Sequence, residues 1–194
     1  MQFANDEFYH VYNRSFNKTT VFYKDENYYY FIRKLNSIRN LCDIIAYCLM
    51  PDHFHLLIYI PEKSEATRLT ALSGLTGIQL ISRKVGTILS SYTQGINKQE
   101  KRAGSLFQPK TKAKLLDQKN YPFNCFHYIH QNPHKARLVE KIEDWRFSSF
   151  TEYCEGSSGI CRKDLAYQFL EIPQEKDQFL KQSYQVIDYV DVIN

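Results

Sequence analysis

The sequence lacks several features that would place it in a specialised class of protein. Its five cysteines are an odd number and form no C-x-x-C pair, which argues against a disulfide framework or a zinc knuckle and favours a reducing cytoplasm. The most apolar stretch, residues 44–61, is interrupted by Asp52, His53 and His55, so we expect no membrane span. The first seven residues are polar and acidic, which is the opposite of a secretion signal.

Phosphate-binding glycine motifs are also missing. Neither G-x-x-x-x-G-K-[ST] nor G-x-G-x-x-G occurs, so the sequence predicts no ATP or NAD chemistry. The formal charge of +4 is too small to establish a nucleic-acid partner by itself. Aromatic residues, in contrast, are abundant: 15 tyrosines and 13 phenylalanines can build a core or stack on unpaired bases.

The hydrophobic periodicity predicts an α+β fold. Alternation predicts strands at residues 8–12, 43–49, 53–60 and 106–116, and helical spacing predicts helices over 26–40, 85–96 and 122–132. The last helix should end near Asn132, because the residue before Pro133 is disfavoured in the α region. Alternation of this kind favours one mostly antiparallel sheet with packed helices. Broken helical patterns continue through the tail, residues 164–194.

Two histidines at the start of the 53–60 strand are candidate metal ligands. Alternate residues of a strand face the same way, so His53 and His55 share one face while Phe54 points to the other. Two imidazoles on one face form half of a metal site. The same pattern also fits two surface histidines on an exposed sheet face.

The 122–132 helix supplies a candidate nucleophile. Tyr128 and Asn132 are four residues apart and share a helix face, so a phenol and an amide oxygen could point at one place. Two alternatives stay open at this point. Tyr128 could simply pack the helix onto the sheet, and Tyr121, seven residues earlier on the same face, is a rival nucleophile.

A basic stretch precedes this helix. Lys110, Lys112 and Lys114 alternate, so a strand would project them from one face, where they suit a phosphate backbone. The alternative interpretation is a solvated sheet edge, on which lysines prevent aggregation.

Together these pieces resemble the single-tyrosine HUH transposases, and among them the IS200-like, REP-associated tyrosine transposases. The resemblance rests on YHVYNR from residue 9, MPDHFHLL from residue 50, LFQ from residue 106, YIHQNP from residue 128 and WRFSSF from residue 145. It covers residues 8–153. Arg137 departs from the pattern, because relatives more often have glycine in this segment, and this could alter the local turn.

The resemblance implies a role for each candidate residue. His53 and His55 would be metal ligands for Mg²⁺ or Mn²⁺, Asn132 would be the third ligand, and Tyr128 would be the nucleophile. Single-stranded or hairpin DNA would be cleaved and rejoined through a 5′-phosphotyrosine. Arg14 and the three lysines are our candidates for contacts to the DNA backbone.

The resemblance also implies a single five-stranded, mostly antiparallel sheet like that of an RNA-recognition fold. We expect a transposase domain over residues 1–155 and a helical C-terminal extension over 156–194. The expected location is the bacterial cytoplasm, at the nucleoid when DNA is bound and not in a membrane. The sequence leaves the oligomeric state open, and a homodimer is one option.

Two other functions compete with the transposase. A domesticated DNA-binding protein would keep the scaffold without moving DNA. A zinc hydrolase for small substrates would need an acidic ligand beside the histidine pair, and Asp52 is expected to point to the other face.

Overall fold

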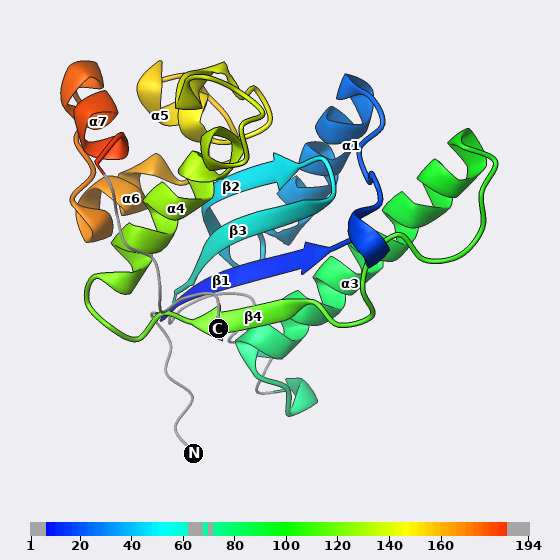
Figure 1. Ribbon diagram of the computed structural model, residues 1–194. Helices are drawn as coiled ribbons and strands as arrows, with labels where there is room; N and C mark the ends of the chain where they lie inside the picture. The colour runs from blue at the N-terminus through cyan, green and yellow to red at the C-terminus, as the bar shows by residue number, and fades with distance from the viewer. Residues whose placement is uncertain (1–6, 62–67, 70–71, 186–194) are drawn as a thin grey trace.

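The computed structural model describes residues 7–61, 68–69 and 72–185 of the chain. Its strands are β1 (Glu7–Arg14), β2 (Asp43–Met50), β3 (His53–Ile60) and β4 (Lys112–Leu115). Its helices are α1 (Asp25–Leu35), α3 (Gly77–Gln99), α4 (Tyr121–Lys135), α5 (Phe150–Cys154), α6 (Lys163–Leu170) and α7 (Lys176–Ser183) (Figure 1). Short 3-10 turns cover Phe16–Lys18, Asn36–Ile38 and Ile142–Asp144.

The four strands form one antiparallel sheet in the order β2-β3-β1-β4. The α+β class is therefore confirmed, whereas the fifth strand is not found among the described residues. The strand expected over 106–116 is split. Phe107 forms an isolated bridge with Ser15, but Pro109 has no N–H to continue the ladder, and regular pairing resumes only at β4.

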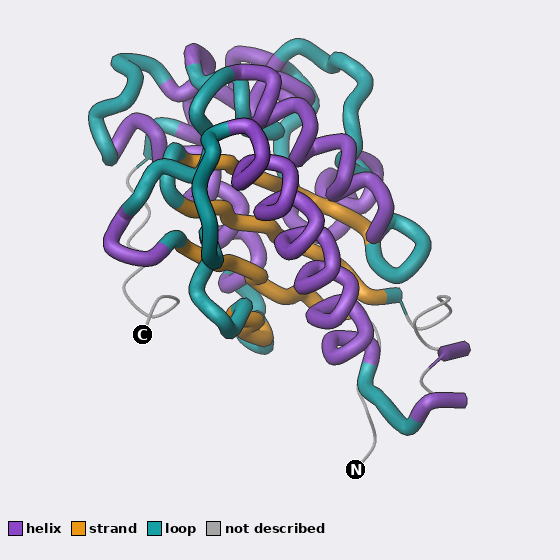
Figure 2. Tube along the Cα trace, turned by 90° about the vertical axis from the view of Figure 1, so that its right-hand side faces the viewer, coloured by secondary structure: helices purple, strands orange, loops and turns teal. Residues whose placement is uncertain are grey.

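Helices cover both faces of the sheet (Figures 1 and 2). On one face, α1 and α3 bury Phe54, Leu56 and Ile58 of β3 in an apolar core. On the other face, α4 packs Phe126 and Ile129 onto the opposite side of β2 and β3. Because side chains alternate along β3, the same strand that anchors the first core presents its histidines to the α4 side.

Helix α4 runs past the point where the sequence predicts its end. The helix continues through Pro133 to Lys135, although Pro133 cannot donate a hydrogen bond to Ile129. Buried contacts on both sides of α4 outweigh this local cost, since tertiary packing overrides propensity. Arg137 then adopts a φ of 58°, in the left-handed region that favours glycine, so the departure from the family pattern falls on a strained position.

The C-terminal helices pack against the α4 side of the sheet. Ala166 and Leu170 of α6 and Phe179 of α7 belong to the same apolar core as Phe126. The boundary between a transposase domain and a C-terminal extension at residue 155 stays a prediction. Within the described ranges, no helix has the length and apolar character needed to cross a bilayer.

Candidate active site

Strand β3 places both candidate histidines beneath α4. His55 lies opposite Tyr12 of β1, and His53 lies opposite Arg14. Directly opposed residues of an antiparallel pair project to the same face, so these four side chains share the α4 side of the sheet. The two imidazole rings are perpendicular, with their centroids 5.0 Å apart. His55 is buried and His53 is half-buried, which leaves the pair facing a cleft instead of bulk solvent.

Each of the two imidazoles has a hydrogen-bond partner at its Nδ1 atom. His55 Nδ1 lies 2.9 Å from His10 Nε2, and His53 Nδ1 lies 2.5 Å from Asp52 Oδ1. The Asp52 carboxylate accepts from His53 Nδ1, which leaves His53 Nε2 with its lone pair, as metal-bound histidines require. The His10–His55 contact is compatible with the same tautomer of His55, in which Nδ1 donates and Nε2 keeps its lone pair. The expectation that Asp52 points away from the pair is wrong, because the turn before β3 lets its carboxylate fold back onto His53.

Burial keeps His10 and His55 neutral. The pKa of His10 is lowered to about 3, mainly by removal from water and to a smaller extent by the charge of Lys114. Burial is also the main cause that lowers the pKa of His55 well below its usual value, with His10 and His53 adding to the effect. Two neutral imidazoles can share one hydrogen bond without electrostatic repulsion, and both can act as ligands or acceptors.

Helix α4 brings Tyr128 over this patch. The Tyr128 ring stands edge-on to His55 with centroids 5.6 Å apart, and 6.1 Å from His10. Tyr128, His53 and His55 line one cleft of about 350 Å³. Tyr121 is not among the residues that line it, because it lies about 10 Å earlier along the helix axis. The structure therefore places Tyr128, and not its rival, beside the histidine pair.

The surroundings of Tyr128 act on its phenol in opposite directions. Burial raises the pKa of Tyr128, while a side-chain hydrogen bond with Asn132 lowers it. Asn132 also donates from Nδ2 to the backbone oxygen of Tyr128 at 3.0 Å. Asn132 is not among the cleft-lining residues, so the structure puts it next to the nucleophile candidate without placing it against the histidines.

The predicted basic residues do not form one group. Arg14 lines the cleft, and Lys112 lies over the Tyr12 ring at 5.7 Å. Lys114 is opposite His10 in the β1–β4 ladder. Lys110 lies in a bend before β4, so the expected single strand face of three lysines is wrong for this residue.

Sequence reasoning missed several residues of the site, among them His10, Tyr12, Lys18 and Asp52. The alternation of His10 and Tyr12 on β1 was a usable signal, because it puts both on one face. The other two depend on turns that periodicity does not describe. Within the described part of the chain, no set of three or more His, Cys, Asp or Glu side chains could hold a metal ion. A third protein ligand would therefore have to be of another type, such as an amide.

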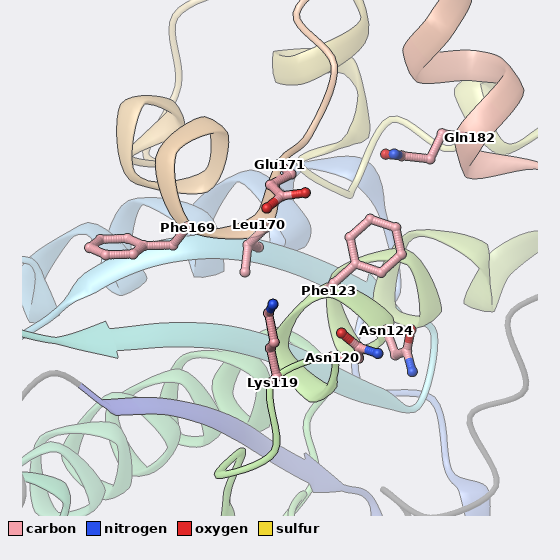
Figure 3. Close-up of a pocket in the computed structure, with 8 residues that line it drawn as sticks. All are labelled: Lys119, Asn120, Phe123, Asn124, Phe169, Leu170, Glu171 and Gln182. Atoms are coloured by element: carbon pink, nitrogen blue, oxygen red, sulfur yellow. The ribbon is translucent and has the colours of Figure 1, made fainter.

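A second cavity, of about 430 Å³, lies at the other end of α4 (Figure 3). Lys119 and Phe123 reach into it from the start of α4, and Glu171 faces them from the end of α6. Its lining contains no His, Cys, Ser or Tyr. It therefore offers neither a phenol, hydroxyl or thiol nucleophile nor an imidazole ligand, whereas the first cleft holds a phenol beside two imidazoles.

An antiparallel sheet that holds a histidine pair opposite a helix-borne tyrosine is the arrangement that the sequence resemblance implies. Comparison with known proteins agrees. A family model described as "Transposase IS200 like" matches residues 5–132, about two thirds of the chain. The chain belongs to the IS200-like transposase family.

Two known proteins are similar to this chain. A Haemophilus influenzae protein whose name places it among the REP-associated tyrosine transposases is 29% identical over 110 residues, which are 56% of this chain and 58% of that protein. The chain thus matches a little over half the length of this curated relative. A solved REP-associated tyrosine transposase bound to a REP hairpin has a similar fold, with a TM-score of 0.58 and 18% identity over 82% of this chain and 87% of the other.

Proposed function

We propose that this chain is a metal-dependent single-strand DNA endonuclease and strand transferase with Tyr128 as its nucleophile. The observation that carries the proposal is the shared cleft, in which the Tyr128 ring lies 5.6 Å from the His55 ring. Membership of the transposase family supports an enzyme that acts on DNA. The solved relative is bound to a REP hairpin, which supports single-stranded or hairpin DNA as the substrate.

The donor atoms of the cleft fit a divalent cation. His53 and His55 would hold Mg²⁺ or Mn²⁺ through their Nε2 atoms, because their Nδ1 atoms are engaged by Asp52 and His10. Asn132 does not line the cleft, so it would act as the third ligand only after its side chain turns toward the histidines. Its hydrogen bond to the Tyr128 backbone uses Nδ2 and not the amide oxygen. When bound, such an ion would polarise the phosphate and favour the charged form of the phenol.

The proposed reaction exchanges one phosphate ester for another. Tyr128 Oη attacks a phosphodiester phosphorus, forming an Oη–P bond while the P–O3′ bond breaks. The phenol proton is lost to solvent, and the leaving O3′ takes up a proton. The products are a 5′-phosphotyrosine and a free 3′-hydroxyl, and attack by a 3′-hydroxyl on the phosphotyrosine rejoins the strand. Because the ester energy is kept, no nucleotide cofactor is needed.

A denaturing gel with a labelled hairpin oligonucleotide tests the proposal. We expect a protein–DNA adduct with Mg²⁺ or Mn²⁺, its loss in Tyr128→Phe, and its retention in the matched control Tyr121→Phe. DNA binding should survive in both variants, because one hydroxyl is removed from a partly buried ring. Adducts that persist in Tyr128→Phe would exclude this nucleophile. Binding without any adduct from the unaltered protein would favour the domesticated DNA-binding alternative.

A further inference from the structure

The chain leaves β1 through a turn whose backbone does not suit its sequence. Asn17 and Lys18 both have positive φ values, 51° and 55°, and Thr19 N donates to Phe16 O at 3.0 Å to close the turn. This is the arrangement of a type I′ turn, for which Asn-Gly is the preferred central pair. Asn17 is an ordinary occupant of its position. Lys18 stands where glycine would carry no strain.

The surroundings hold this turn in place. Ser15 N donates to Asp52 O at 2.8 Å, and Phe16 N donates to Leu106 O at 3.3 Å. Thr19 also donates from its hydroxyl to Phe16 O at 2.7 Å. The turn is therefore anchored on both sides, to the residue before His53 and to the segment before β4. Strained backbone that persists under such constraints tends to occur at functional sites.

The strained lysine faces the candidate active site. Lys18 lines the cleft together with Arg14, His53 and Tyr128. An ammonium group here adds a second cation, beside the guanidinium of Arg14, where the phosphodiester would lie. Replacing Lys18 by glycine would relieve the backbone, so the lysine side chain is kept at a cost in stability.

An exposed aromatic ring belongs to the same turn. Phe16 is 44% exposed, so part of its ring is accessible from solvent. A base that is not paired can stack on such a ring whatever its identity, and a neighbouring cation can bind the phosphate of the same strand. The turn thus presents both kinds of group that recognise a nucleotide in a single strand.

We propose that the Phe16–Lys18 turn is a nucleotide subsite of the cleft. Lys18 binds a phosphate of the single strand next to the bond that Tyr128 attacks, and Phe16 stacks on an adjacent unpaired base. The subsite positions the strand without reading its sequence, because stacking and phosphate contacts are shared by all bases. It rests on the proposed function, since that function places single-stranded DNA in the cleft.

Two lysine-to-glycine variants separate binding from backbone strain. Lys101 also has a positive φ, 50°, and is exposed in the turn after α3, away from the cleft. Lys18→Gly and Lys101→Gly remove the same charge and relieve the same strain. Both should raise the Tm by about 2–4 °C. Only Lys18→Gly should weaken binding of a single-stranded oligonucleotide and lower its salt dependence, by about 0.7 in the slope of log K against log salt.

The stacking role of the Phe16 ring is tested with a second pair of variants. Phe16→Ala should weaken binding of an oligonucleotide with an unpaired flank by about 5- to 100-fold. Binding of a fully paired duplex should change little, because paired bases do not expose their faces. Phe169→Ala is the matched control, since Phe169 is 45% exposed but lines the second cavity.

All affinities are measured in the Tyr128→Phe background, so that no strand is cleaved. The proposal is overturned if Lys18→Gly and Lys101→Gly bind alike, or if Phe16→Ala and Phe169→Ala bind alike. Either result leaves the proposed function intact, provided that the unaltered protein still forms adducts. Selective losses at Lys18 and Phe16 without any adduct would support the subsite and refute the chemistry.

Discussion

Replacing His10 by phenylalanine would test how the histidine pair is held. The phenylalanine ring keeps the bulk of a side chain that is 1% exposed and stacks on Tyr12 at 4.7 Å. What it removes is the Nε2 atom that pairs with His55 Nδ1 at 2.9 Å. The variant therefore isolates one hydrogen bond from the packing around it.

His10→Phe should lower both the stability of the fold and its affinity for a metal ion. His55 would keep a buried Nδ1 atom without its hydrogen-bond partner, which costs about 1–3 kcal/mol of unfolding free energy. In a chain of this size, that lowers the Tm by about 2–4 °C for each kcal/mol. The freed imidazole of His55 can also change tautomer and rotate. Loss of such a supporting hydrogen bond lowers metal affinity about 10- to 100-fold.

Thermal unfolding and Mn²⁺ titration calorimetry measure the two losses. His127→Phe is the matched control, because His127 is also fully buried and hydrogen-bonded, to Gln182 Oε1 at 3.1 Å, but does not line the cleft. Both variants should lose stability, and only His10→Phe should lose Mn²⁺ affinity. Unchanged Mn²⁺ affinity in His10→Phe would refute the tautomer argument.

Three further predictions concern stability and DNA binding. Gly159→Ala should cost about 1–3 kcal/mol of unfolding free energy in urea, because a Cβ atom there would lie 1.9 Å from Cδ of the buried Glu152. Burial lowers the pKa of His127 to about 4, below its value of about 6.5 in the unfolded chain. The free energy of unfolding that neutral His127 contributes is therefore complete above a pH of about 6.5 and is lost as the pH falls from there towards 4. His127→Gln should therefore reduce the slope of unfolding free energy against pH by about 1.4 kcal/mol per unit between these limits, and an unchanged slope would contradict the assignment. Lys112→Gln, which removes the cation over Tyr12, should lower the salt slope of single-strand binding by about 0.7, whereas no change would place the strand elsewhere.

Local periodicity was enough to predict much of the framework. The spacing of His53 and His55 along β3 fixes their common face, because a strand repeats every two residues. The strands β1, β2 and β3 lie where periodicity predicts them, and α1, α3 and α4 overlap the predicted helices. The bounds differ, since α1 ends at Leu35 instead of residue 40 and α3 begins at Gly77 instead of residue 85. Two errors occur at prolines. Distant packing carries α4 through Pro133, whereas the missing N–H of Pro109, a local property that periodicity ignores, splits the expected strand.

The sequence by itself determined which side chains share a face on each element, since that depends only on backbone geometry within one segment. Residue spacing could not choose between Tyr121 and Tyr128, which only the family resemblance did, and it could not join His10 to His55 across 45 positions of the chain. Those outcomes depend on the register of β1 against β3 and on where α4 crosses them. Register and crossing are set by long-range packing, so only the tertiary structure decided which phenol meets the imidazoles.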